Sequence, residues 1–489
     1  MNQNILEKYL WGAATTLRGT IDAGDYKQYI FPLLFFKRIC DVYDEEFESA
    51  LASSDGDKTF AKFNENHHFQ IPKESHWKKV REVTVNVGMA IQSSMRSIEQ
   101  TNPDTLTGIF GDATWTNKDR LSDDILINLI EHFSMQNLSL SSVPNDQLGD
   151  GYEYLIKEFA DDSGHTAAEF YTNRTVVKLM TMIMNPQPGE SVYDPTCGSG
   201  GLLLNCALHL KDEEKEYRSL KLYGQEINLL TSAIARVNMF LHGIEEFEII
   251  RGNTLSNPAF IENDKLKKFN VILANPPYSI KSWDQKGFES DPYGRNIWGI
   301  PPKRCADYAF QQHIHKSLHL DNGRSITLWP HGILFRDAEV KMRIKMIKED
   351  LVECVIGLGP NLFYNSPMES CLLILRTNKD VHKKGKILFI NAVNEVKKQP
   401  SISYLENEHI SNIFKAYENF EDKEYFSALI SNEDVLLNNG DMTLSLYVQP
   451  EKKTQNTSSF EDALFQWNQS KKSIKTTMND LFKTLEDQS

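Results

Sequence analysis

Short apolar runs alternate with helical patterns between about residue 190 and residue 390, and this alternation constrains the fold more than any other feature of the chain. Each run has the length of a buried strand, and the segments between the runs carry helical patterns. Strand–helix alternation over this length favours an α/β fold with an open, mainly parallel sheet and helices on both faces. The predicted strands are residues 191–193, 220–225, 247–250, 271–274, 325–329, 352–357, 372–376 and 387–390.

The chain before and after this region has a different pattern. The first part is predicted to be mostly helical, because apolar residues from Tyr29 to Tyr43 follow a helical period. The polar segment 136–145 then has the composition of a linker. We therefore predict a helical domain over residues 1–145, a sheet domain over residues 146–400 and a helical tail over residues 401–489.

Composition places the chain among ordinary globular proteins, with 489 residues of which 40% are apolar and 25% charged. The net charge of −14 argues against a protein that wraps nucleic acid by itself, although a local basic groove or a basic partner is compatible with it. The six cysteines are scattered, which indicates neither disulfides nor a metal site and fits a reducing cytoplasm. No apolar segment approaches the ~20 residues of a membrane span, so we expect a cytoplasmic protein without a membrane partner.

The tetrapeptide Asn275-Pro276-Pro277-Tyr278 ends one of the predicted strands. An amide, two prolines and an aromatic ring contribute little to a core, but they suit a flat group that carries an amine, such as a nucleobase. The Asn275 side chain and the Pro276 carbonyl can each accept one hydrogen from that amine, and Tyr278 can stack on the ring. With no ordinary general base in the motif, the site suits a reaction driven by positioning.

Three other strand ends carry candidate ligand contacts. Residues 194–201 (DPTCGSGG) follow a strand and open a helix, where glycines let backbone N–H groups approach a ligand. Glu226 follows the second strand, where a carboxylate grips a ribose diol, and Asn253 follows the third. Each has a plain structural alternative: a tight turn, a helix-capping glutamate and a Gly-Asn turn. Together with Asn275 they place one candidate contact at each of four successive strand ends.

This ordered set of motifs resembles the S-adenosylmethionine-dependent amino-methyltransferases that act on DNA adenine. Residues 168–174 resemble their first cofactor motif, and residues 306–310, 328–336 and 355–364 resemble later segments. The helical start, with residues 33–39, is similar to the modification subunit of type I restriction–modification systems. The resemblance implies S-adenosyl-L-methionine as cofactor and a Rossmann-like, mainly parallel methyltransferase sheet of seven strands.

The resemblance also implies residue roles. Asn275, Pro276 and Tyr278 would be catalytic and hold a flipped base, while Asp194 would bracket the cofactor's ammonium group. The chain departs from the family at Asn173, where proline is usual, at Asn253, where aspartate is usual, and in residues 365–369, where Gly, Thr and Pro are frequent. The implied cofactor-binding residues are Glu169, Phe170, Tyr171, Thr172, Asn173, Arg174, Asp194, Gly198, Ser199, Gly200, Gly201, Glu226 and Asn253, with no metal ligand.

The expected function is methyl transfer to the N6 amine of adenine in DNA. The two acceptors would pull the amine hydrogens out of the ring plane, which localises the lone pair toward the methyl group. Two alternatives stay open. The same pair of acceptors suits a methyltransferase for RNA or for protein glutamine, and a scaffold that kept the fold could have lost catalysis, with Asn253 as the hint.

Sequence recognition requires something beyond these motifs, because only about ninety residues follow the predicted sheet and they contain no obvious base-reading module. We expect double-stranded DNA and a specificity subunit as partners, together with a second copy of this chain and, as a further candidate, a restriction or translocase subunit. The heptad pattern over residues 460–485 suits either docking on a partner helix or folding back on the chain itself. Basic and aromatic residues interleave in segment 279–305, which predicts contact with DNA.

Overall fold

The computed structural model describes residues 2–162, 172–362, 368–398, 402–449 and Trp467, without the side chains of residues 161 and 162. The chain divides into two units, Met1–Val448 and Gln449–Ser489. Among the described residues, no helix combines the length and apolar content needed to cross a lipid bilayer. All six cysteines are buried free thiols.

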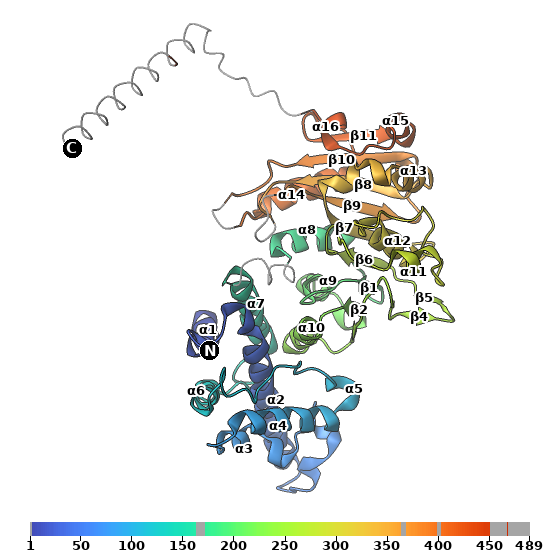
Figure 1. The fold of residues 1–489 in the computed structure, drawn as a ribbon. Helices are drawn as coiled ribbons and strands as arrows, with labels where there is room; N and C mark the ends of the chain where they lie inside the picture. The colour runs from blue at the N-terminus through green and yellow to red at the C-terminus, as the bar shows by residue number, and fades with distance from the viewer. Residues whose placement is uncertain (1, 163–171, 363–367, 399–401, 450–466, 468–489) are drawn as a thin grey trace, which may run out of the picture. The chain divides into compact units, whose positions relative to one another are not determined.

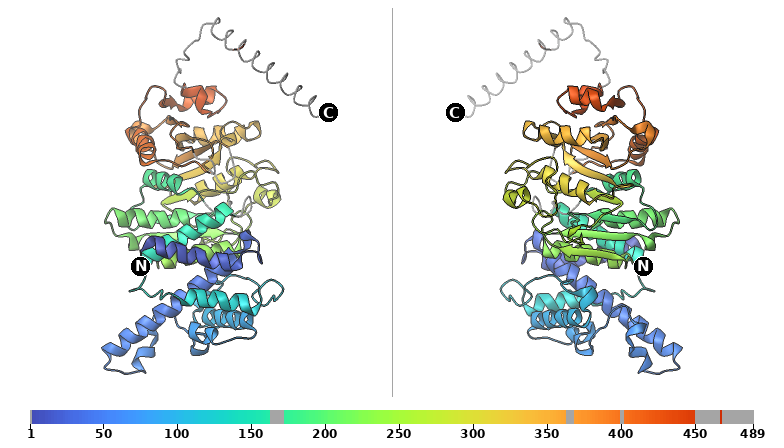
Figure 2. Two further views of the ribbon diagram at one scale, coloured as in Figure 1. Left: turned by 90° about the vertical axis from the view of Figure 1, so that its left-hand side faces the viewer. Right: turned by 90° about the vertical axis from the view of Figure 1, so that its right-hand side faces the viewer.

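The centre of the larger unit is a mixed sheet in the order β11-β10-β8-β9-β7-β6-β1-β2-β3 (Figure 1). Most neighbouring strands are parallel, while β9 runs antiparallel between β7 and β8, and β11 runs antiparallel to β10. Figure 2 shows the strands following one another from the green β1–β3 edge to the orange β10–β11 edge. The strands are β1 (Ser191–Asp194), β2 (Lys221–Glu226), β3 (Phe247–Arg251), β6 (Val271–Ala274), β7 (Arg324–Pro330), β8 (Val352–Leu358), β9 (Ser370–Arg376), β10 (Lys386–Ala392) and β11 (Ser427–Ser431).

The α/β class and all of the predicted strands are confirmed, but the expected count of seven strands is wrong. The sheet has nine strands in the described residues, because β10 and β11 extend it beyond β8. β11 also lies in the region predicted to be a helical tail. Its register on β10 pairs Leu388 with Leu429, so a short edge strand replaces the expected helix there. A separate two-stranded hairpin consists of β4 (Ile261–Glu262) and β5 (Lys265–Leu266).

Side chains of the sheet alternate between hydrophobic clusters on its two faces. In β7, for example, Ile326 and Leu328 pack in a core with α8, α9 and α14, whereas Trp329 packs on the opposite face with α12 and α13. This two-sided burial explains the continuous apolar strands that the sequence displays. The helices of this part are α8 (Arg174–Met184), α9 (Gly201–Asp212), α10 (Leu229–Leu241), α11 (Gln285–Glu289), α12 (Asp307–Ser317), α13 (Val340–Lys348), α14 (Asn407–Asn419), α15 (Asn432–Leu437) and α16 (Leu444–Tyr447).

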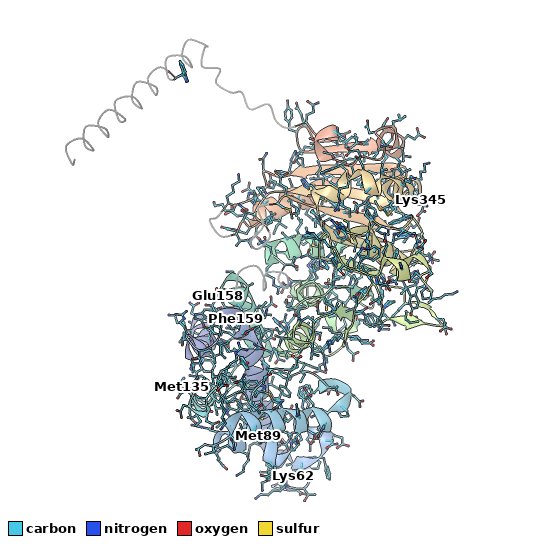
Figure 3. All side chains as sticks on the ribbon, viewed as in Figure 1. Lys62, Met89, Met135, Glu158, Phe159 and Lys345 are labelled. Carbon is cyan, nitrogen blue, oxygen red and sulfur yellow. The ribbon has the colours of Figure 1, made fainter. Side chains whose placement is uncertain are left out.

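The N-terminal region is helical, as predicted, and shares its core with the sheet region. Ile234, Val237 and Leu241 of α10 lie in the same apolar cluster as the N-terminal helices. Phe159 lies in this cluster, whereas Met89 and Met135 remain exposed on the surface (Figure 3). The helices are α1 (Gln3–Leu17), α2 (Lys27–Ser53), α3 (Trp77–Arg81), α4 (Val87–Thr101), α5 (Pro103–Leu106), α6 (Asp123–Ser134) and α7 (Asn145–Asp162).

The predicted linker is held firmly against helix α2. The buried Arg38 guanidinium donates to the Leu138 and Val143 carbonyls, and Glu45 accepts a hydrogen bond from the Leu140 amide at 2.7 Å. A segment whose backbone groups are satisfied in this way is an ordered connection. The boundaries 1–145, 146–400 and 401–489 remain a prediction, and the heptad segment 460–485 lies outside the described residues apart from Trp467.

Candidate active site

The parallel pairing of β1, β2, β3 and β6 brings their carboxyl ends to one edge of the sheet. Asp194 and Glu226 end β1 and β2, Asn253 lies just after β3, and Asn275 follows β6 directly. The four strand ends selected from the sequence are therefore neighbours in space. Their neighbourhood follows from the strand order, which the sequence alone did not provide.

The glycine-rich loop turns tightly between β1 and α9. Gly198 and Gly200 have positive φ angles of 53° and 79°, a conformation that favours glycine. A Cβ on Gly200 would lie 2.9 Å from Met239 Cε of α10, and a Cβ on Gly201 would overlap the Arg174 guanidinium. The positive φ therefore favours glycine at position 200, and at position 201 a larger residue would require the Arg174 side chain to move.

Two buried carboxylates line this loop. Glu226 accepts hydrogen bonds from the Gly198 amide at 3.1 Å and the Asn228 amide at 2.8 Å, while Asp194 accepts one from the Thr196 amide at 2.9 Å. Burial raises the pKa of Asp194 to about 8, with a smaller contribution from the neighbouring Glu226 charge. Burial also raises the pKa of Glu226. A pair of this kind favours a ligand that brings positive charge or hydroxyl donors.

Arg174 connects this loop to the helical region. Its guanidinium forms an ion pair with Glu153 of α7. Glu153 also accepts a hydrogen bond from Asn238 Nδ2 at 2.6 Å, and that nitrogen lies 3.1 Å from the Ser199 carbonyl oxygen. Glu153 and Asn238 were missed by the sequence analysis, because single polar residues on amphipathic helices give no signal of their own. Arg174 is thus linked to the glycine-rich loop through Glu153 and Asn238.

Asn275 is held from both sides of its amide. Its Nδ2 donates to Thr172 Oγ1 at 3.1 Å, and its Oδ1 accepts a hydrogen bond from the Tyr278 hydroxyl at 2.6 Å. Tyr278 is half-buried and its ring lies 6.2 Å from that of Trp329, at an angle of 48°. Burial raises the pKa of the Tyr278 hydroxyl well above its usual value, so the phenol stays protonated and donates. Pro276, the next residue, is buried.

Thr172 was expected to bind the cofactor, and in the structure its hydroxyl contacts the Asn275 amide. An acceptor on Nδ2 fixes which way the amide faces, so Oδ1 is turned toward Tyr278. This contact joins residues more than one hundred positions apart, which explains why no local pattern indicated it.

Two of the three family departures, Asn173 and Asn253, have local structural roles. Asn173 is the N-cap of α8: its Oδ1 accepts from the Thr175 amide at 3.0 Å, and its Nδ2 donates to the Ser403 carbonyl at 2.8 Å. Asn253 uses its side-chain oxygen to accept from the Leu255 and Ser256 amides, as in a plain turn. Glu169, Phe170, Tyr171 and residues 365–367 lie outside the described residues.

Part of the DNA contact predicted for segment 279–305 is wrong. Arg295 is buried, forms an ion pair with Asp291 and donates to the Thr254 and Leu255 carbonyls, so it anchors this segment to the loop after β3. Trp298 is 1% exposed and its indole nitrogen donates to Glu349. Lys281, Lys286, Lys303 and Arg304 are exposed and remain candidates for phosphate contact.

Two family models match the chain. The one described as N-6 DNA Methylase matches residues 143–456, and the one described as HsdM N-terminal domain matches residues 6–133. The type I restriction enzyme MjaVII methylase subunit of Methanocaldococcus jannaschii is 30% identical over 449 residues, which span 87% of this chain and 75% of that protein.

Two further similarities extend over most of the chain. The type I restriction enzyme MpnII methylase subunit of Mycoplasma pneumoniae is 28% identical, over 92% of this chain and 90% of that protein. The crystal structure of a type I restriction-modification system methyltransferase subunit from Streptococcus thermophilus superimposes with a TM-score of 0.79 and 28% identity, over 92% of this chain and 100% of that one.

The matched models cover the helical region and the sheet region in the order in which the structure displays them. The strand-end edge described above lies within the N-6 DNA Methylase match. The chain therefore belongs to the N-6 DNA methylase family, as a methylase subunit of the type I restriction–modification class that methylates adenine in DNA.

Proposed function

We propose that the chain uses S-adenosyl-L-methionine to methylate adenine N6 in double-stranded DNA, with Asn275, Pro276 and Tyr278 at the reacting amine. The observation that carries this proposal is the Asn275 amide, which is anchored through Nδ2 on Thr172 and leaves Oδ1 with an exchangeable donor, the Tyr278 hydroxyl. An amine of the base can take the place of that hydroxyl.

The residues at the ends of β1 and β2 fit the proposed cofactor. Its sulfonium and ammonium groups are cationic, and the buried Asp194 gains a favourable charge partner when one of them is near. Glu226 suits the ribose hydroxyls, since a carboxylate at the end of the second strand accepts from a diol. Gly198, Ser199, Gly200 and Gly201 would provide the close backbone surface. Glu169, Phe170, Tyr171, Thr172, Asn173, Arg174 and Asn253 complete the proposed cofactor set.

The chain's own residues would activate the amine by geometry. S-adenosylmethionine, when bound, supplies a methyl group on a positively charged sulfur. Asn275 Oδ1 and the Pro276 carbonyl would each accept one amine hydrogen, which draws the nitrogen out of conjugation with the ring. The nitrogen lone pair would then be free to take up the methyl group, and the surplus proton of the amine would leave to solvent. Tyr278 would stack on the base, a contact worth about 1–3 kcal/mol.

We further propose that a specificity subunit selects the site and that a second copy of this chain joins the complex. The acidic chain supports this proposal, because a net charge of −14 gives little unaided attraction to a phosphate backbone. A restriction or translocase subunit is a further candidate partner. The exposed Lys281, Lys286, Lys303 and Arg304 would contact phosphates close to the catalytic strand.

The test is Asn275→Ala in the full-length chain, co-purified with its specificity partner. Methyl transfer to cognate DNA should fall by at least about 10²-fold, because one of two acceptors aimed at the developing charge is removed. Binding of S-adenosylmethionine, measured by calorimetry, should be unchanged. Asn419→Ala, which truncates an exposed asparagine at the end of α14, serves as the matched control and should retain full transfer.

Retained transfer by Asn275→Ala would contradict the mechanism. Parallel assays on RNA and on a glutamine-containing protein substrate address the alternative amines, and faster wild-type transfer to either would contradict the DNA assignment. Cofactor binding without turnover by the wild-type complex on cognate DNA would instead support an inactive scaffold.

A further inference from the structure

We infer that Asp307, held in place by Arg336, is a positioning residue that keeps the turn after Asn275-Pro276-Pro277-Tyr278 in its base-accepting form. This inference deepens the proposed function and rests on it. Asp307 is fully buried and accepts from the Ser279 amide, so its proposed role is to act on the backbone that carries Asn275 and Tyr278.

The turn has an unfavourable backbone conformation at its last residue. Ser279, immediately after Tyr278, has φ of 49°, in the left-handed region that glycine adopts easily and other residues disfavour. A non-glycine residue stays there only when neighbouring contacts hold it. The Ser279 amide belongs to the peptide bond that follows Tyr278, so a contact that holds this amide also restrains the backbone that carries Tyr278 opposite Asn275 Oδ1.

Asp307 supplies the contact that holds Ser279. Its Oδ1 accepts a hydrogen bond from the Ser279 amide at 2.7 Å, and the carboxylate is fully buried. A buried ionised acceptor forms a stronger hydrogen bond than a neutral group does. Asp307 is the first residue of α12, so the turn is tied to a helix packed under the sheet.

Arg336 fixes the carboxylate in turn. Its guanidinium pairs with Asp307 Oδ2, and its Nε lies 2.9 Å from Glu339 Oε2. A second guanidinium nitrogen, Nη1, donates to Cys305 Sγ at 2.9 Å and lies 3.4 Å from Ser279 Oγ. Arg336 therefore contacts both the strained residue and the acid that holds it.

Cys305, Asp307 and Glu339 are grouped closely enough to suggest metal ligands, with their ligand atoms within 4.8 Å of one another in the described residues. The Arg336 guanidinium contacts all three, however, and supplies the positive charge that the buried acids need. Burial raises the pKa of Glu339, and the charge of the same arginine opposes that rise. The group is explained as a support for Arg336 and Asp307.

The first test is Asp307→Ala in the full-length complex with cognate DNA. Turnover should fall about tenfold or more, while the dissociation constants for S-adenosylmethionine and DNA change less than about twofold, because the binding surfaces stay in place. Asp307→Asn keeps an oxygen that accepts from the Ser279 amide, so it should lose less turnover than the alanine variant. This second variant keeps the inference testable if removal of the buried acid weakens folding.

The decisive test is rescue by Ser279→Gly in the Asp307→Ala background. Glycine takes the left-handed conformation without help, so the double variant should recover most of the lost turnover. Asn263→Gly is the matched control, because Asn263 also has a positive φ, of 51°, but lies in the hairpin between β4 and β5. It should give no recovery.

No recovery by Ser279→Gly would contradict the inference, as would recovery by Asn263→Gly or a loss confined to cofactor affinity. Wild-type transfer with an unaffected Asp307→Ala variant would contradict this inference and leave the proposed function standing. Absence of transfer by the wild-type complex would contradict both.

Discussion

The cofactor side and the base side of the strand-end edge hold their polar groups in different ways. On the cofactor side, Glu226 and Asp194 accept hydrogen bonds from backbone amides of the loops that they support. On the base side, Asn275 is held by the hydroxyls of Thr172 and Tyr278. Backbone contacts persist as long as the loop keeps its fold, whereas side-chain hydroxyls can exchange partners by rotation. The two sides are therefore expected to respond differently to substitution.

This difference fits the tasks of the two sides. A cofactor site that must bind the same molecule in every cycle gains from a preformed loop. A base pocket must exchange its contacts when a base enters, and a hydroxyl that already occupies the acceptor keeps that acceptor satisfied until then. Substitutions on the cofactor side should change affinity, and substitutions on the base side should change turnover.

The largest effect on cofactor affinity is expected for Gly201→Ala. The added Cβ would overlap the Arg174 guanidinium and displace it from Glu153, which costs about 2 kcal/mol or roughly 30-fold in cofactor affinity. Turnover at saturating cofactor should change little. Calorimetric titration with S-adenosylmethionine checks the affinity.

A double variant sharpens this expectation. In an Arg174→Ala background the side chain that clashes with the new Cβ is gone. Adding Gly201→Ala to that background should therefore lower cofactor affinity only slightly further. If the affinity losses of the two substitutions add, the Cβ at position 201 acts through something other than Arg174.

A smaller effect on the same side is a pH dependence of cofactor affinity through Asp194. Its pKa of about 8 means that the acid is mostly neutral at pH 7, while binding of a cationic group favours the carboxylate. Affinity should rise about tenfold between pH 7 and pH 9, with proton release on binding at pH 7. Calorimetry in buffers of different ionisation enthalpy measures that proton, and Asp194→Asn should abolish the pH dependence.

The stability of the ligand-free protein should fall as pH rises, whereas cofactor affinity should rise. The folded pKa of Asp194 lies above its usual value of 3.8, so the neutral acid's contribution is fully present below pH 3.8 and is lost as pH rises through about 8. A melting temperature that rises with pH over that window in the wild type, but stays flat in Asp194→Asn, would contradict this assignment.

The smallest effect is expected on the base side, for Tyr278→Phe. The variant keeps the ring that stacks on the base and loses only the hydroxyl that donates to Asn275 Oδ1. Because the proposed base amine replaces that hydroxyl, turnover should stay within about threefold of wild type, the range expected from one net hydrogen bond. Single-turnover methylation measures this turnover. Tyr278→Ala is the comparison variant, and it should lose more turnover because the ring that stacks on the base is removed as well. If both variants lose turnover equally, the contribution of Tyr278 to turnover comes from its hydroxyl and not from stacking.

Much of the site was predictable from the sequence because its parts are local. The glycine-rich loop, Glu226 and the Asn275-to-Tyr278 motif each lie where a strand ends, and periodicity located those ends to within one residue. The contacts that orient Asn275 were not predictable in the same way. Thr172, Asp307 and Arg336 come from three other parts of the chain, and nothing in their immediate sequences indicates that they converge on one turn.

Segment 279–305 shows that a local sequence pattern can also predict a surface that the fold does not form. Its alternation of basic and aromatic residues predicted a nucleic-acid surface, yet Arg295 and Trp298 are buried and hold the segment against neighbouring loops. Composition counts charges and rings, but it does not distinguish a guanidinium in solvent from one that donates to buried carbonyls. Burial depends on which loops lie opposite, and that is a property of the folded chain.

The sequence by itself determined the α/β class, the strand positions and the residue types at four strand ends, because hydrophobic period and turn chemistry are local. Only the tertiary structure decided the nine-strand order, the neighbourhood of those four ends and the partners of Asn275, Ser279 and Arg174. The physical reason is that a strand's neighbours and a side chain's hydrogen-bond partners are set by packing between distant segments. A local pattern indicates that a residue can accept or donate; the fold determines what it meets.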